Sequence, residues 1–189
     1  MRIIVMGLAL CLFLILNATA AEGPIDRGSN FLGGAFIYSE SGGDLYDNQD
    51  LSVVEIEGFY RNFFWKRVAI GAILDYSHYK HGDDPSVDLF SFGPTIACFF
   101  GKMDDNTFPF LEIAYTFDNN FYGSNSSTGS KFIIGGGVAL RVTPHLAVYN
   151  ELTYNFETIE GVSGRTFKLK IGLGGFLFKK YQAGSLALN

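Results

Sequence analysis

The sequence predicts an all-β protein, an eight-stranded antiparallel up-and-down transmembrane β-barrel. Three observations support this prediction. About eight runs of roughly ten residues alternate apolar and polar side chains, which is the period of a β-strand. The breaks between these runs alternate between polar loops and short turns. The polar face of the runs is rich in Gly, Ala, Ser and Thr and carries few charges, which suits the interior of a narrow barrel better than a surface facing water.

The N-terminal residues are expected to form a secretory signal peptide. Arg2 supplies a positive n-region, and the apolar run from Ile3 to Leu16 is shorter than the roughly 20 residues that span a bilayer. Ala18-Thr19-Ala20 has the small-x-small pattern of a signal peptidase site, although an uncleaved anchor is the alternative. The predicted organisation is a signal peptide over residues 1–20, a barrel domain over 21–178 and a C-terminal tail over 179–189.

Composition excludes several classes of protein. Cys98 is the only cysteine outside the predicted signal peptide, so an internal disulfide is not expected, although small exported domains commonly need one. A closed barrel in lipid would supply the missing stability. The net charge is −5 and basic residues form no patch, which excludes nucleic acid as a partner. No second apolar run reaches spanning length, which excludes a helical membrane protein.

The first four expected strands cover residues 30–39, 51–61, 67–79 and 87–100. In each, apolar residues recur at every second position and therefore share one face of the strand. These stripes are Leu32, Phe36 and Tyr38; Val54, Ile56 and Tyr60; Val68, Ile70, Leu74 and Tyr76; and Phe90, Phe92, Ile96 and Cys98. Pro94 interrupts the fourth strand because it lacks a backbone donor, so a β-bulge is expected at Gly93-Pro94.

The last four expected strands cover residues 108–117, 131–142, 146–157 and 165–178. Their apolar stripes are Leu111, Ile113, Tyr115 and Phe117; Phe132, Ile134, Val138 and Leu140; Leu146, Val148, Leu152, Tyr154 and Phe156; and Phe167, Leu169, Ile171 and Leu173. Aromatic residues recur at the strand ends, as in the interfacial girdles of membrane barrels.

The connections differ in length and composition. The polar loops are expected at residues 40–50, 80–86, 118–130 and 158–164, and the shorter connections at 62–66, 101–107 and 143–145. Bacterial outer-membrane barrels have long extracellular loops and short periplasmic turns. Both ends of the barrel domain then lie on the periplasmic side. The longest loop, from Asn119 to Ser130, is expected to carry most of any binding specificity.

The charged residues on the polar faces predict an ion-pair network inside the barrel. Buried charges must find partners, and an interior position supplies them. In an up-and-down barrel the last strand lies between the seventh and the first, so Glu151 is expected within reach of Lys168 or Lys170. The predicted members of this lumenal network are Glu55, Glu57, Asp75, Glu112, Glu151, Lys168 and Lys170.

The signal peptide, the repeated alternating strands and the aromatic-rich final strand (Phe167 to Phe178) make the chain resemble the small outer-membrane β-barrel superfamily, the porin-like eight-stranded barrels of the OmpA/OmpX type. The resemblance covers essentially the whole mature chain. It implies a Gram-negative outer-membrane location, with membrane lipid and the barrel-assembly machinery as partners. Members of the family typically end on an aromatic residue that this machinery reads. Here the chain continues from Lys179 to Asn189, so the insertion signal is expected to be internal, or the tail to fold back.

The sequence predicts no catalytic residue, no cofactor and no metal site. His78 and His81 lie at the outer end of the third strand, but the adjacent Ser77 and His78 point to opposite faces and do not form a dyad. His145 is expected in a turn. The acidic loop residues Asp44, Asp47, Asp50, Asp83, Asp84 and Asp88 are the kind of ligand that Ca²⁺ prefers, but solvated loops are the simpler interpretation.

We therefore expect an outer-membrane barrel with a structural or surface-interaction role, in which the extracellular loops carry any ligand specificity. About eight strands enclose an interior that side chains just fill, so a wide pore is not expected. Three alternatives stay open on the sequence alone. They are a lipid-modifying outer-membrane enzyme, a narrow channel, and a soluble exported β-barrel that binds an apolar ligand.

Overall fold

The structure, a computed structural model, describes residues 23–42, 51–79, 87–102, 104–122 and 125–178. The predicted signal peptide, the predicted tail and residues 43–50 and 80–86 lie outside the described residues, as do His81 and all the acidic residues of the predicted loops named above except Asp88.

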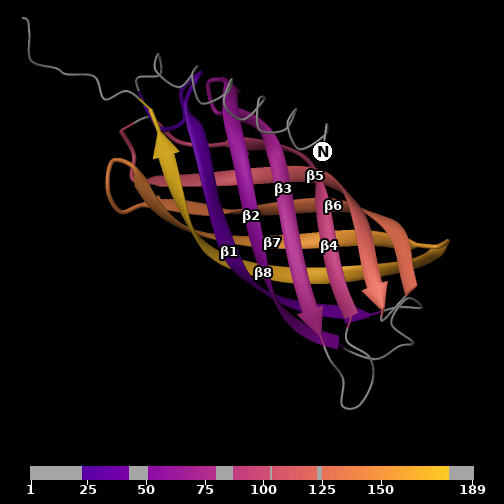
Figure 1. Ribbon diagram of the computed structural model, residues 1–189. Coiled ribbons are helices and arrows are strands. Elements are labelled where there is room, and N and C mark those ends of the chain that lie inside the picture. Colours follow the sequence, from indigo (N-terminus) through magenta and orange to yellow (C-terminus); the bar gives the residue numbers. More distant parts are fainter. Residues whose placement is uncertain (1–22, 43–50, 80–86, 103, 123–124, 179–189) are drawn as a thin grey trace, which may run out of the picture.

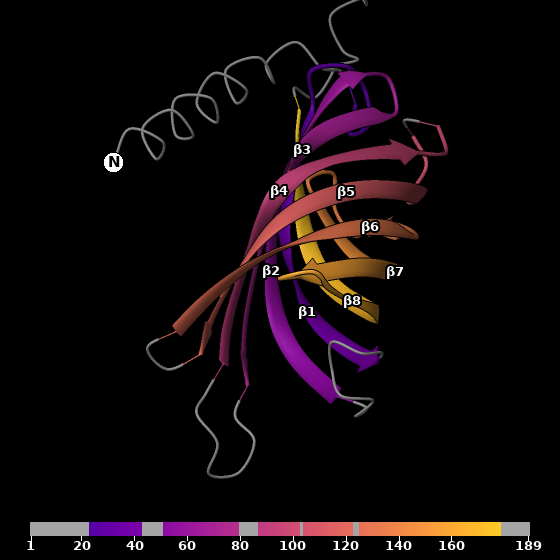
Figure 2. The same ribbon diagram turned by 90° about the vertical axis from the view of Figure 1, so that its right-hand side faces the viewer.

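Eight antiparallel strands form a closed barrel (Figure 1). The strands are β1 (Asn30–Gly42), β2 (Leu51–Trp65), β3 (Val68–Tyr79), β4 (Val87–Phe99), β5 (Thr107–Tyr122), β6 (Asn125–Arg141), β7 (Leu146–Ile159) and β8 (Val162–Leu177). Each strand pairs with its neighbours in sequence, and β8 pairs with β1 to close the sheet. Figure 2 shows β3 to β8 following one another along the wall. The predicted fold class is confirmed.

The barrel wall is apolar outside, whereas the buried polar and charged side chains lie on its inner face. The predicted apolar stripes point outward, and large side chains on them remain exposed, such as Phe36 at 71% and Leu111 at 60%. Their neighbours on the opposite face are buried, as the strict alternation along β7 shows. A water-soluble barrel requires the reverse arrangement, so the soluble alternative is wrong. The described part of the chain contains no helix that is long and apolar enough to cross a membrane.

The expected bulge in β4 is wrong. Pro94 lies opposite Ala72 and Gly93 opposite Ile73 in an unbroken register, and the β4–β5 register is the same on both sides of this pair. The strands β4 and β5 approach closely beside Pro94, where a Cβ on Gly93 would lie only 1.9 Å from the Tyr115 carbonyl oxygen. The register shifts instead between Phe63 and Trp65. The strand β2 ends only at Trp65, so it takes up most of the predicted connection 62–66.

The predicted loop 118–130 is also wrong. This segment continues β5 and β6 into a hairpin in which Asp118 pairs with Gly129 and Phe121 with Ser126. Strand pairing on both sides overrides a composition that is typical of loops. The predicted loop 158–164 reduces to a two-residue turn at Glu160-Gly161, whose φ values are 51° and 85°. Two successive positive φ values fit the right-handed twist of a tight hairpin.

Candidate functional site

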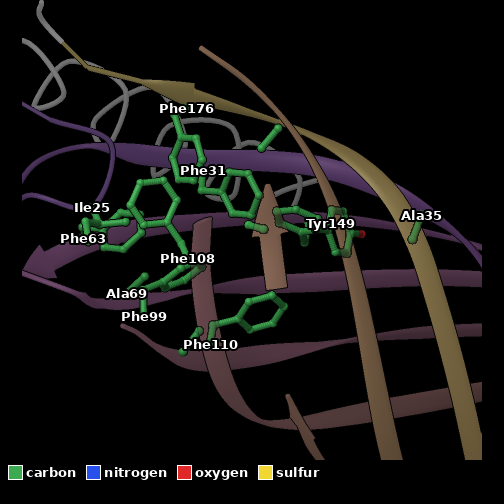
Figure 3. Close-up of a cluster of buried hydrophobic side chains, with 14 of the residues drawn as sticks. Ile25, Phe31, Ala35, Phe63, Ala69, Phe99, Phe108, Phe110, Tyr149 and Phe176 are labelled. Carbon is green, nitrogen blue, oxygen red and sulfur yellow. The ribbon is translucent and has the colours of Figure 1, made fainter. Parts of the chain in front are cut away.

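The end of the barrel that carries the short turns is filled by aromatic rings. We call these residues the phenylalanine plug: Phe31, Phe59, Phe63, Phe99, Phe108, Phe110 and Phe176. They come from β1, β2, β4, β5 and β8, and all are buried. Phe31 stacks on Phe176 with ring centroids 4.4 Å apart, and Phe99 stacks on Phe110 at 5.2 Å. Figure 3 shows most of these rings converging inside the barrel. Offset aromatic contacts of this kind stabilise a core beyond the burial of their area.

The segment before β1 completes the seal. Ile25 is fully buried and joins the phenylalanine plug, as Figure 3 shows. Its carbonyl accepts a hydrogen bond from the Arg67 amide at 2.8 Å, and the Gly28 amide donates to the Phe63 carbonyl at 2.7 Å. The Ser29 hydroxyl donates to the Pro24 carbonyl at 2.9 Å. These bonds hold residues 23–29 across this end of the barrel.

Inward-facing glycines make room for the rings. A Cβ on Gly174 would lie 2.3 Å from the ring of Phe31, and a Cβ on Gly172 would lie 2.6 Å from the ring of Tyr149. Both distances are far below van der Waals contact. The glycines of β8 are therefore part of the packing of this end, because a larger residue would displace a ring.

The middle of the interior is charged. Arg61 forms an ion pair with Glu112, which also accepts a hydrogen bond from the Thr95 hydroxyl at 2.6 Å. Lys170 donates to Glu57 at 2.5 Å and lies 3.7 Å from Glu151. The guanidinium carbon of Arg61 lies 4.2 Å from the centre of the Phe59 ring, a cation–π contact that joins the charged zone to the plug.

A second set of charges lies nearer the outer end. Lys168 forms an ion pair with Glu55, which also accepts a hydrogen bond from the Ser77 hydroxyl. Lys131 Nζ lies 3.9 Å from Asp118 Oδ2. The buried side chains Ile73, Ala114 and Ile133 pack together as a separate small apolar cluster. The outer half of the interior is thus polar, with one apolar patch.

The structure places all seven residues of the predicted lumenal network inside the barrel, each no more than 4% exposed. It brings together Lys168 with Glu55, and Lys170 with Glu57 and Glu151. Glu112 meets Arg61, which the sequence prediction left out of the network. Asp75 is buried, but its Oδ1 has no hydrogen-bond partner among the described residues.

Sequence reasoning missed four charged members of the interior. These are Arg61, Lys131, Asp118 and Glu157, all buried. Arg61 and Glu157 already fall on inward positions of their expected strands, so the alternation alone would have included them. Asp118 falls at the start of the predicted loop 118–130, and Lys131 at the start of the predicted strand that follows this loop. Their pairing across β5 and β6 could therefore not be expected.

Acids outnumber bases in the described interior. Seven buried carboxylates face four buried cations, by count of the buried residues. Among the described residues both carboxylate oxygens of Glu151, one of Glu57 and two nitrogens of Arg61 have no hydrogen-bond partner. Buried polar atoms without partners are costly, and water is their usual partner in folded proteins. The charged zone is therefore suited to hold ordered water rather than an apolar ligand.

One more polar cluster lies on the outside of the wall. His78 Nδ1 lies 2.6 Å from Asp88 Oδ1, and the Tyr76 hydroxyl donates to the same oxygen at 2.9 Å. His145 lies at the opposite end, where its Nδ1 is 3.0 Å from the Phe176 carbonyl oxygen. Within the described ranges no group of three or more His, Cys, Asp or Glu side chains is placed to hold a metal ion.

No protein-family model matches the chain, and no curated protein matches it in sequence. Solved structures match it in fold. Neisserial surface protein A aligns with a TM-score of 0.65 at 14% identity, covering 79% of this chain and 99% of its own. Ail, the attachment invasion locus protein of Yersinia pestis, aligns with a TM-score of 0.51 at 12% identity, covering 82% and 99%. The outer membrane protein OprG of Pseudomonas aeruginosa aligns with a TM-score of 0.53 at 10% identity, covering 85% and 99%.

The closed sheet, the apolar exterior and the matching structures all indicate the same fold. A barrel of this kind must place its exposed apolar belt in lipid, and bacterial barrels of this size span the outer membrane. The chain therefore has the fold of the small eight-stranded outer-membrane β-barrels, and this fold indicates the outer membrane as its location.

Proposed function

We propose that this protein is an outer-membrane barrel with a structural or surface-interaction role, and that its outer end carries any ligand specificity. The observation that supports this proposal best is the sealed interior. The phenylalanine plug and Ile25 fill the end with the short turns, and paired charges fill the middle. A barrel with a filled interior acts through its lipid-facing wall and its ends.

The same observation argues against the narrow channel. Conduction needs a continuous polar path, and an ion crossing the plug would have to leave its hydration shell among stacked rings. Ile25, held by the Arg67 amide, lies across the same end. A current would therefore require the plug to open.

The outer end offers a polar surface with aromatic character. The hairpin of β5 and β6 exposes Asn119, Phe121, Ser126 and Thr128. Adaptable polar groups beside an aromatic ring are typical of protein recognition surfaces. This hairpin supports the surface-interaction role, and it lies where the sequence predicted a binding loop.

The charge of this end bears on the class of ligand. The Ail barrel was also solved with the heparin analogue sucrose octasulfate, a polyanion. Here the described part of the outer end carries Asp88 and Glu160 beside one exposed cation, Arg165. We infer that a polyanion does not suit this surface, and that a neutral or basic protein surface suits it better.

A lipid-modifying enzyme is the second candidate, and His78 favours it. A histidine and the carboxylate that orients it are two of the three groups of a hydrolytic triad. His78 and Asp88 form such a pair on the lipid-facing side of the outer rim. The third part is missing among the described residues. Ser77 points into the barrel and donates to Glu55, so it cannot serve as the nucleophile.

Fractionation with three functional assays tests the proposal. We expect the protein in the outer-membrane pellet, with a gel band that shifts on boiling. It should give no conductance in planar lipid bilayers bathed in potassium chloride solution. Mass spectrometry should show that lipopolysaccharide acylation is unchanged in cells that express it. The adhesion of cells that express the native protein to immobilised basic and acidic matrix proteins is then compared with the adhesion of cells that express a matched variant. In this variant a two-residue Asn-Gly turn replaces residues 119–128. Steady conductance, altered acylation or a soluble protein would each overturn the proposal.

A further inference from the structure

The sealed end of the barrel carries basic residues next to lipid-facing apolar side chains. Trp65 is 65% exposed at the end of β2, and Lys66 and Arg67 follow it in an exposed turn. The same pairing recurs in the other turns of this end. Phe100 is 46% exposed near the exposed Lys102, and Val142 is 63% exposed beside Arg141. An exposed aromatic or aliphatic side chain beside a cation is typical of the interface between lipid tails and headgroups.

The turn with Lys66 and Arg67 is held in one conformation. Arg67 has a φ of 70°, which is uncommon for a residue with a side chain. Its amide donates to the Ile25 carbonyl at 2.8 Å, and its carbonyl accepts from the Phe99 amide at 2.7 Å. Trp65 is stacked on Phe64 with centroids 5.2 Å apart. The two cations are therefore presented from a fixed turn rather than from a loose loop.

Three cations of this end are not neutralised by neighbouring described acids. Among the described residues, no carboxylate forms an ion pair with Lys66, Arg67 or Lys102. The described acids of this end are Asp26, Asp104 and Asp105, of which Asp26 accepts from the Arg27 amide and Asp105 from the Lys102 amide. The described cations of this end number five, namely Arg27, Lys66, Arg67, Lys102 and Arg141. The opposite end carries Arg165 and the acids Asp88 and Glu160, so the described charges differ between the two ends of the barrel.

We propose that this rim binds the phosphodiester headgroups of anionic phospholipids in the leaflet at the sealed end, with Trp65, Lys66 and Arg67 as the principal site. Lipid is the occupant that the positions favour, because these cations directly follow side chains at the edge of the lipid-facing belt. A soluble polyanion would make no apolar contact with the exposed indole of Trp65, whereas a lipid would. A cation close to an anionic membrane surface raises lipid affinity roughly fivefold.

The chain offers a direct probe, because Trp65 is its only tryptophan. The folded protein is reconstituted in vesicles of phosphatidylcholine that contain equal fractions of either brominated phosphatidylglycerol or brominated phosphatidylcholine. Bromine quenches indole fluorescence only at contact, so the ratio of the two quenching constants reports which lipid surrounds this residue. Because the site carries two cations, we expect brominated phosphatidylglycerol to quench at least roughly fivefold more strongly, and the difference to shrink in molar salt.

Two variants separate this site from a general charge effect. The double variant Lys66→Gln, Arg67→Asn removes both charges, and Asn tolerates the positive φ of position 67. We expect its quenching ratio to fall close to one. The matched control Arg165→Gln removes a cation at the other end and should keep the ratio of the native chain. A heat-modifiable gel band shows that each variant is folded.

The proposal fails if the native protein shows no preference between the two lipids, if the double variant keeps the preference, or if Arg165→Gln loses it. It rests on the placement of the barrel in a membrane, and the assay tests the two separately. A protein outside the bilayer would be quenched by neither brominated lipid. A protein in the bilayer without the site would be quenched equally by both.

Discussion

The two halves of the barrel interior are stabilised in different ways. At the sealed end, rings from five strands pack over glycines, as in the core of a water-soluble protein. In the outer half, charged side chains pair across the lumen and leave polar atoms that suit water. Aromatic packing depends on shape, and buried ion pairs depend on the presence of both partners. Substitutions in the two halves should therefore lower the unfolding free energy for different reasons. Different second substitutions should restore it.

The largest effect is expected in the charged half, at Arg61. The variant Arg61→Met keeps an apolar stem on Phe59 but leaves Glu112 buried without its cation. Removing one partner of a buried pair costs about 3–5 kcal/mol of unfolding free energy. Urea unfolding in lipid vesicles, followed by the heat-modifiable gel band, measures this loss. The double variant Arg61→Met, Glu112→Gln should recover much of it, and a double variant as unstable as the single one would contradict the ion-pair account.

A smaller effect is expected in the sealed half, at the glycines of β8. Gly174→Ala places a methyl group against the ring of Phe31, and such overpacking costs about 1–3 kcal/mol. The second substitution Phe31→Leu should relieve it, because the three atoms nearest to the added methyl group all belong to that ring. Gly172→Ala makes the matched comparison, since its Cβ would also lie 2.3 Å from the Gly34 carbonyl oxygen. Tyr149→Leu should not rescue it, and equal rescue at both sites would refute the shape argument. The same urea titration measures all four variants.

The smallest effect is expected outside both halves. Asp88→Asn weakens the contact with His78 on the exposed outer wall, where solvent screens charges. The urea midpoint should not change measurably. Lipopolysaccharide acylation should also be the same as in cells with the native protein. A change in acylation without a change in stability would favour the lipid-modifying enzyme.

The alternation of residues was enough to predict which side chains face inward, because a strand has a period of two. The same signal places Phe31, Phe110 and Phe176 on the inner face near the short turns, so most of the phenylalanine plug was within reach of sequence reasoning. Ile25 was not, since Gly23, Pro24 and Gly28 around it are typical of a linker.

Other features depend on contacts that no local pattern encodes. Whether Glu112 meets Arg61 or a lysine depends on the stagger between β2 and β5, which are not neighbours in the sheet. The pairing of residues 118–130 was hidden by their Asn, Ser and Gly content. It depends on the flanking strands β4 and β7, which continue the ladders on either side.

The seam between β1 and β8 has a consequence for biogenesis. It joins the first and last strands of the chain, with Asn30 opposite Leu177 and Gly33 opposite Gly174. Until β8 has been made and delivered, both edges of the sheet present unpaired amides and carbonyls to any other strand. Closure is thus the most non-local contact of the molecule and is expected to be slow. Gly33 and Gly174 have no side chains that could guide this closure. The backbone ladder and the flanking rings must therefore set the register of the final strand.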